Sequence, residues 1–167
     1  FIVNVVINKE RQVAGVFGGH HGEAHVKGCE FVAQHAVAEV EQELDLVITS
    51  AGGAPLDKTF YQVSKCLTSA KDILKKGGTI LVICDCVEGL GSEEFTSIMR
   101  TNSTPEEFDR NHSNPDDFVI DQWCAQNIYQ ALEHAGQIFI YSPGLSKEDI
   151  EGFHGVKVEG CQVTVDQ

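Results

Sequence analysis

Short apolar runs rich in β-branched residues alternate along this chain with longer stretches whose apolar residues recur at helical spacing. The runs cover residues 44–53, 79–86 and 137–144, and each ends in or is followed by glycine. Helical patterns separate them, from about Thr59 to Lys76 and from about Asp116 to Ala135. Strands that alternate with helices are typical of a parallel sheet covered by helices. The pattern predicts an α/β fold, a three-layer sandwich with a mostly parallel sheet and flanking helices.

The N-terminal edge has a different pattern. Residues 1–8 and 11–19 are β-branched runs separated by Lys9-Glu10, which predicts a hairpin or two closely spaced strands.

The run at 44–53 is continuously apolar, as in a strand buried on both faces. The other expected elements are helices at about 23–43, at 93–99 and from 105, a small helix at 146–150 and a strand-like tail at 156–165.

Length and charge limit the possible functions. The chain has 167 residues, 42% of them hydrophobic, which suits a single α/β domain over residues 1–167. A formal net charge of −13 argues against nucleic acid and anionic membranes as partners, because both select basic surfaces. No apolar run approaches the roughly 20 residues that cross a bilayer, and we expect a cytoplasmic protein. Any anion site must create its own local positive potential.

Cysteine use favours a structural role. At least four of the six cysteines fall inside apolar core patterns, where they behave as small buried apolar residues. Cys84 and Cys86 would direct both thiols to one strand face, which leaves redox or zinc use as the alternative. No second pair completes a four-ligand zinc set. The cysteines are at positions 29, 66, 84, 86, 124 and 161.

The chain begins at Phe1, and its only methionine is Met99. We therefore expect a processed chain or an excised domain, with part of the working protein missing. Because the first residues are already strand-like, a cut at a domain boundary is favoured.

The segment GGAPLDKTFYQVSK, residues 52–65, places many chemically useful groups on one strand-to-helix corner. Gly52-Gly53 has no Cβ and so allows a ligand close to the backbone. Tyr61, Gln62 and Lys65 are helix neighbours at i, i+3 and i, i+4 spacing, near a helix N-terminus that favours anions. Together they suit a small carboxylate bearing a hydroxyl; the alternative is a solvated helix face. The apolar stripe of this helix lies elsewhere: Phe60, Val63, Leu67, Ala70 and Leu74.

Histidines form a second candidate site. His21 and His25 are four residues apart and can share a helical face, with His20 and Glu23 nearby. The surrounding glycines instead favour a strand-to-helix corner with ordinary polar histidines. Two convergent histidines without further ligands are weak evidence, and we assign no metal ligand in this chain.

The stretch VITSAGGAPLDKTFYQVSK closely resembles the second domain of the nickel-dependent lactate racemase family. In that family a Gly-Gly-x-Pro-x-Asp turn leads to Tyr-Gln-x-x-Lys, which is the most specific element of the likeness. Three further stretches resemble the family in the same order: AGVFGGHHGEAHVKGCEF, GGTILVICDCVEGLGSEEF and DQWCAQ. The resemblance therefore spans nearly the whole chain.

The resemblance implies a two-domain isomerase that racemises or epimerises α-hydroxyacids with a nickel-pincer nucleotide. A hydride passes from the substrate Cα to this cofactor and returns to either face of the ketoacid. The family's nickel ligand, cofactor-attaching residue and acid/base histidines belong to its first domain, and this chain lacks the matching segments. The chain is then expected to be the C-terminal domain, with its own N-terminal domain as partner and no cofactor bound to the fragment alone, which is expected to be inactive.

The resemblance also implies roles for particular residues. Substrate contacts of the second domain carry over to Tyr61, Gln62 and Lys65, of which we assign catalytic roles to Gln62 and Lys65. Gly53 and Trp123 are assigned to substrate binding with Tyr61. A tryptophan on the equivalent helix borders the family's substrate pocket, although Trp123 also fits the edge of the core.

Two functions from different classes remain open. One is the substrate-contacting domain of an α-hydroxyacid racemase or epimerase acting on lactate, malate or a longer sugar acid. The other is a stand-alone α/β domain that binds a small anion without catalysis.

Overall fold

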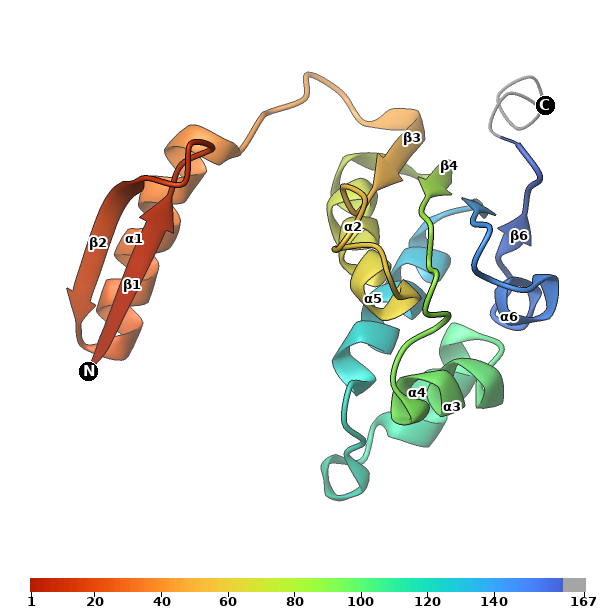
Figure 1. Ribbon diagram of the computed structural model, residues 1–167. Helices are drawn as coiled ribbons and strands as arrows, with labels where there is room; N and C mark the ends of the chain where they lie inside the picture. Colours follow the sequence, from red (N-terminus) through yellow and green to blue (C-terminus); the bar gives the residue numbers. More distant parts are fainter. Residues whose placement is uncertain (161–167) are drawn as a thin grey trace. The chain divides into compact units, whose positions relative to one another are not determined.

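The computed structural model describes residues 1–160 and divides the chain into two compact units (Figure 1). The first unit is Phe1–Glu41, and the second begins at Gln42. The assignment of residues 1–167 to one domain of a larger enzyme stays a prediction. No helix within residues 1–160 is long and apolar enough to cross a membrane.

The first unit is a hairpin packed on one helix. Strands β1 (Ile2–Ile7) and β2 (Val13–Gly19) pair antiparallel, which confirms the expected hairpin, and α1 (His21–Ala36) packs on both strands. Phe17 and Phe31 join sheet and helix, with ring centroids 5.5 Å apart. The helix ends at Ala36 instead of Glu43. The apolar residues just beyond it, Val37 and Val40, are 68% and 46% exposed.

The second unit contains a four-stranded parallel sheet in the order β3-β4-β5-β6. Its helices flank this sheet, so the α/β class predicted from the sequence is confirmed. The strands are β3 (Leu44–Ser50), β4 (Leu74–Ile83), β5 (Gln137–Tyr141) and β6 (Val156–Lys157). The strand-like tail predicted at 156–165 is therefore short in the described part, and residues 161–165 lie outside it.

The helices of the second unit follow the predicted order. Among them, α2 and α5 pack against each other, and α2 packs against β3 and β4. The hydroxyl groups of Ser92, Thr104 and Ser146 accept hydrogen bonds from backbone N–H groups at the starts of α3, α4 and α6. The helices are α2 (Phe60–Ile73), α3 (Glu93–Thr101), α4 (Pro105–His112), the 3-10 helix η1 (Pro115–Asp117), α5 (Gln122–His134) and α6 (Lys147–Glu151).

The apolar stripe predicted for α2 is part of the core of this unit. Each of its five residues is at most 2% exposed: Phe60, Val63, Leu67, Ala70 and Leu74. Phe60 also stacks on Phe153, with ring centroids 5.3 Å apart. Burial of this stripe leaves the other faces of α2 to carry polar groups.

Three expected details were wrong. Strand β3 is not buried on both faces, because Leu46 and Ile48 are 40% and 53% exposed. Helix α2 ends at Ile73, since Leu74 already pairs with Leu44 in the sheet. The long helix expected from 116 is interrupted, because Asp121 adopts a left-handed conformation (φ 67°) just before α5.

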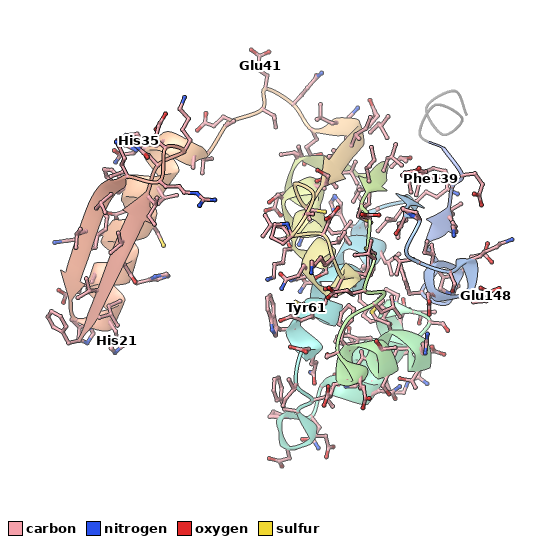
Figure 2. The ribbon with its side chains drawn as sticks, in the orientation of Figure 1. His21, His35, Glu41, Tyr61, Phe139 and Glu148 are labelled. Atoms are coloured by element: carbon pink, nitrogen blue, oxygen red, sulfur yellow. The ribbon has the colours of Figure 1, made fainter. Side chains whose placement is uncertain are left out.

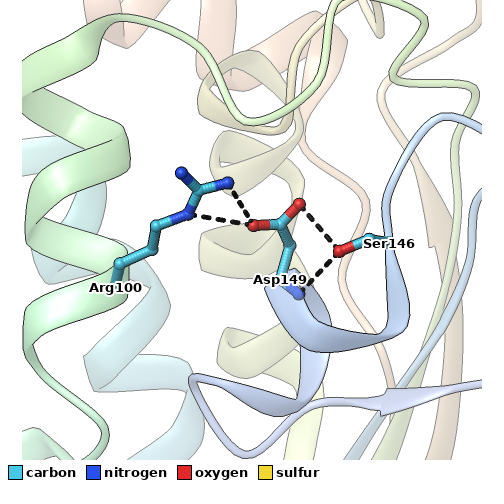
Figure 3. Close-up of polar contacts among 3 residues, drawn as sticks. All are labelled: Arg100, Ser146 and Asp149. Carbon is cyan, nitrogen blue, oxygen red and sulfur yellow. Dashed lines mark hydrogen bonds and ion pairs between the residues drawn. The ribbon is translucent and has the colours of Figure 1, made fainter.

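Helix α6 is tied to α3 by a charged contact (Figure 3). Arg100 donates from Nε and Nη2 to one carboxylate oxygen of Asp149, at 3.1 and 2.8 Å. The Ser146 hydroxyl donates to the other oxygen at 3.0 Å and accepts the Asp149 N–H at 3.0 Å. Asp149 therefore joins the cap of α6 to α3.

Candidate functional site

The corner between β3 and α2 depends on two glycines with left-handed backbones. Gly52 has φ +88° and Gly53 has φ +79°. A Cβ on Gly53 would meet no atom within 4 Å, so backbone conformation and not crowding requires this glycine. The substrate-binding role assigned to Gly53 stays a prediction.

The segment that follows β4 holds the start of α2. The N–H groups of Cys86 and Glu88 donate to the carbonyls of Asp57 and Lys58, both at 2.8 Å. In return, the N–H groups of Phe60 and Tyr61 donate to carbonyls of that segment, Gly89 and Leu90, at 3.0 and 2.8 Å. The first N–H groups of α2 are therefore occupied. This corrects the expectation that the N–H groups at the start of α2 attract an anion. Glu88-Gly89 acts as a structural turn.

Asp57 adds a buried side-chain link to the same clamp. It is 6% exposed, and its Oδ2 accepts the N–H of Asp85 at 3.0 Å. Its other oxygen is buried without a hydrogen-bond partner in the described residues. Asp57 therefore links the start of α2 to the segment after β4 through its side chain.

Lys65 is at the centre of a polar and aromatic group on α2 and α5. Its Nζ donates to Gln62 Oε1 at 2.7 Å and lies 5.5 Å from the centre of the Tyr61 ring. The Trp123 ring on α5 is 5.6 Å from the same ammonium, and the Trp123 and Tyr61 rings are nearly perpendicular to each other. These distances fit cation–π attraction. The structure thus brings together four of the five predicted site residues, with Tyr61 labelled in Figure 2.

The ammonium of Lys65 is available to an incoming anion. Lys65 and Gln62 are exposed, and Trp123 is 46% exposed. Among residues 1–160, no carboxylate lies within ion-pair distance of Lys65. By contrast, the nearby Lys58 is paired with Glu88 at 2.8 Å. Lys65 is therefore the cation of this corner that can meet a carboxylate.

Tyr61 is held from several sides. Its ring meets Phe95 edge-on at 5.5 Å between centroids. Burial, then a hydrogen bond with Cys124 and the charge of Asp121, raise the pKa of Tyr61 to about 12. The phenol therefore stays protonated at neutral pH and can donate a hydrogen bond.

This raised pKa predicts a loss of stability at high pH. The folded pKa of Tyr61 exceeds the ordinary value of 10.0. Its contribution to the free energy of unfolding is therefore complete below pH 10 and is lost as pH rises towards 12. Urea unfolding at pH 9 and pH 11 should show a larger loss in the parent than in Tyr61→Phe. Equal losses of unfolding free energy in both proteins would contradict a raised pKa of Tyr61.

Gly91 fixes the position of Tyr61, which sequence reasoning missed. It has φ +140°, and a Cβ there would lie 2.9 Å from the Tyr61 Cβ. Gly91→Ala should therefore destabilise the second unit by about 1–3 kcal/mol through strain and displacement of Tyr61. Thermal melts measure this, with Gly160→Ala, where a Cβ meets nothing within 4 Å, as the control. Unchanged melting of the Gly91 variant would contradict the close packing.

The histidine site does not gather into a metal centre. His25 Nε2 lies 3.6 Å from the Cys29 sulfur, and the rings of His20 and His21 are 4.3 Å apart. All four residues are exposed. Throughout residues 1–160, no group of three histidine, cysteine or acidic side chains is placed to hold a metal ion.

Comparison with known families decides the relationship. The sequence model for the lactate racemase C-terminal domain matches residues 39–162. The chain belongs to this family. The match begins close to the boundary between the two units, at Glu41.

Two curated relatives are lactate racemases. One, from Thermoanaerobacterium thermosaccharolyticum, is 37% identical over 134 residues, covering 79% of this chain and 31% of the relative. The other, from Lactiplantibacillus plantarum, is 36% identical over 143 residues, covering 84% and 33%. The chain thus spans about a third of the length of the curated relatives it matches.

The fold also matches a solved member of the family. The lactate racemase apoprotein from T. thermosaccharolyticum aligns with a TM-score of 0.82 at 30% identity. The alignment covers 98% of this chain and 39% of that protein.

Proposed function

We propose that this chain supplies the substrate-contacting surface of an α-hydroxyacid racemase or epimerase. The single observation that carries the proposal is the exposed Lys65 ammonium, bonded to Gln62 and bordered by the Tyr61 and Trp123 rings. Membership of the lactate racemase family supports the reaction class. Homologues longer than this chain support a second domain of the same protein as partner.

In this proposal Lys65 and Gln62 bind and orient the oxygens of an α-hydroxycarboxylate. An ammonium has three N–H donors, and Gln62 uses one of them. The remaining two reach a carboxylate or hydroxyl oxygen as charge-assisted hydrogen bonds. Because Gln62 Oε1 already accepts from Lys65, its amide NH2 remains to donate to a second oxygen. Holding both oxygens fixes the substrate Cα for bond cleavage.

Tyr61 and Trp123 complete this surface in different ways. Tyr61 provides a protonated phenol beside Lys65, and Trp123 provides an apolar wall next to the Tyr61 ring, at a similar distance from the ammonium. Apolar walls exclude water and strengthen the charge interactions next to them. The two rings therefore favour binding of a substrate that has lost its surrounding water.

The residues described here do not fit a nickel site, because no suitable ligand group occurs within residues 1–160. A nickel-pincer nucleotide, if used, is held by another part of the protein. We expect the isolated 167-residue chain to retain no stoichiometric nickel after chelation and to racemise nothing. Metal analysis after dialysis and a chiral assay of the chain alone measure both. Tight nickel or turnover by this chain would contradict the proposal.

The proposal is tested with the full-length protein and both enantiomers of lactate, malate and a sugar acid. Chiral chromatography should show interconversion of at least one α-hydroxyacid. Propionate, which lacks the hydroxyl, is the matched control and should give no reaction. Absence of turnover with every hydroxyacid would overturn the enzyme proposal.

The alternative function is anion capture without catalysis. The same surface of Lys65 and Gln62 supports it, since binding a carboxylate needs no cofactor. Calorimetry separates the two: saturable binding of hydroxyacids without interconversion favours the alternative. A cytoplasmic location stays a prediction in either case.

A further inference from the structure

Two buried thiols lie together immediately after β4, behind the corner that carries Lys65. The sulfurs of Cys84 and Cys86 are 3.5 Å apart, within hydrogen-bond distance. The two residues are 5% and 0% exposed. They follow the strand, which ends at Ile83, so strand pleating does not pair them. Cys86 instead adopts a left-handed backbone (φ 52°), uncommon for a residue with a Cβ.

The surroundings of this pair are unusual for an apolar core. Gly144 packs so closely that a Cβ would lie 2.0 Å from the Cys86 carbonyl oxygen, and its N–H donates to Asp85. The charges of Asp57 and Asp85 act to raise the pKa of Cys86, against the larger effect of Cys84, and Cys66 is a neighbouring thiol. The hydrogen bond with Cys84 holds the pKa of Cys86 below its usual value and raises that of Cys84. Cys86 is therefore the better nucleophile of the pair.

We propose that Cys84 and Cys86 form an oxidation site that a hydroperoxide converts into an intramolecular disulfide. The Cys86 thiolate attacks one oxygen of hydrogen peroxide, the O–O bond breaks, and Cys86 becomes a sulfenic acid. The Cys84 sulfur, losing its proton, then attacks the Cys86 sulfur and displaces the hydroxyl as water. Overall, two thiols and one hydrogen peroxide give one disulfide and two waters. Peroxide is small enough to reach the pair through local opening.

Oxidation at this position would act on the candidate site through hydrogen bonds already present. The N–H of Cys86 donates to Asp57, and the carbonyls of Gly89 and Leu90 accept the first N–H groups of α2. We expect that drawing the sulfurs from 3.5 Å to bonding distance shifts the turn at Asp85 that joins the two residues. The start of α2, and with it Tyr61, is then less firmly held. The oxidation itself does not depend on the proposed function.

The sequence provides a direct test by mass spectrometry. Trypsin cleaves after Lys76 and Arg100, so peptide 77–100 contains both cysteines and no other, while Cys66 falls in peptide 66–71. After peroxide treatment and blocking of free thiols, peptide 77–100 of the full-length protein should be unalkylated. Its mass should be about 2 Da below that of the same peptide with two free thiols. A thiol reductant should reverse this. In Cys86→Ala the lighter species should disappear, whereas Cys29→Ser, at an exposed thiol, should leave it unchanged.

Other products overturn the proposal. A cross-link between peptides 66–71 and 77–100 would assign the disulfide to Cys66, and full alkylation of both thiols would show no reaction. Hydrogen exchange tests the link to the corner without relying on activity. A peptide containing the first turn of α2, from Phe60, should exchange several-fold faster in the oxidised protein. Unchanged exchange there would refute coupling to the corner.

Discussion

Lys65→Ala in the full-length protein is expected to reduce racemisation by about 30- to 900-fold with little effect on stability. The fall corresponds to about 2–4 kcal/mol of transition-state stabilisation, as for loss of one oxyanion-hole donor. Lys65 is exposed, and exposed substitutions usually change stability by about 0.5 kcal/mol or less. The measurement pairs racemisation rates with thermal melts.

Matched variants separate a specific contact from a general charge effect. Lys71→Ala removes the same charge near the other end of α2 and should keep near-normal turnover. Lys65→Arg should restore activity only in part, because a planar guanidinium does not replace a compact ammonium in a small site. Gln62→Ala should show a smaller loss, since a neutral hydrogen bond is worth less. Near-normal turnover by Lys65→Ala would mean that the corner is an ordinary helix surface.

Much of the fold was predictable from local patterns. The hairpin, the parallel strands and the apolar stripe of α2 follow from periodicity, which is a property of each segment by itself. Helix ends were less predictable, because the end of α2 depends on Leu74 pairing with Leu44 elsewhere in the sheet. Exposure of Leu46 and Ile48 likewise depends on what covers β3, which the segment itself does not encode.

The candidate site shows the same division. Spacing on one helix places Tyr61, Gln62 and Lys65 together, as i, i+3 and i, i+4 neighbours must be. The contribution of Trp123 comes from α5, and only the likeness to a known family indicated it. Occupation of the first N–H groups of α2 by Gly89 and Leu90 required contacts between distant segments. The positive potential expected from the helix end is therefore supplied mainly by Lys65.

Phe60→Ala is expected to lower the free energy of unfolding of the second unit by about 3–5 kcal/mol, the usual cost of truncating a buried phenylalanine. Phe60 is 0% exposed and stacks on Phe153, so alanine leaves a cavity between α2 and the segment after α6. Urea unfolding of the 167-residue chain measures this, because its only tryptophan, Trp123, reports on the second unit.

The matched control for this substitution is Phe118→Ala, at a phenylalanine that is 63% exposed. It removes the same side chain from a site with little packing and should cost about 0.5 kcal/mol or less. Because Phe60 is the first residue of α2, loss of its buried ring should also loosen the turn that carries Tyr61, although the backbone N–H at position 60 can still donate to Gly89. In the full-length protein, the activity of Phe60→Ala should then fall even under conditions where the variant remains folded. Equal costs for the two phenylalanines would mean that Phe60 does not anchor the corner to the core.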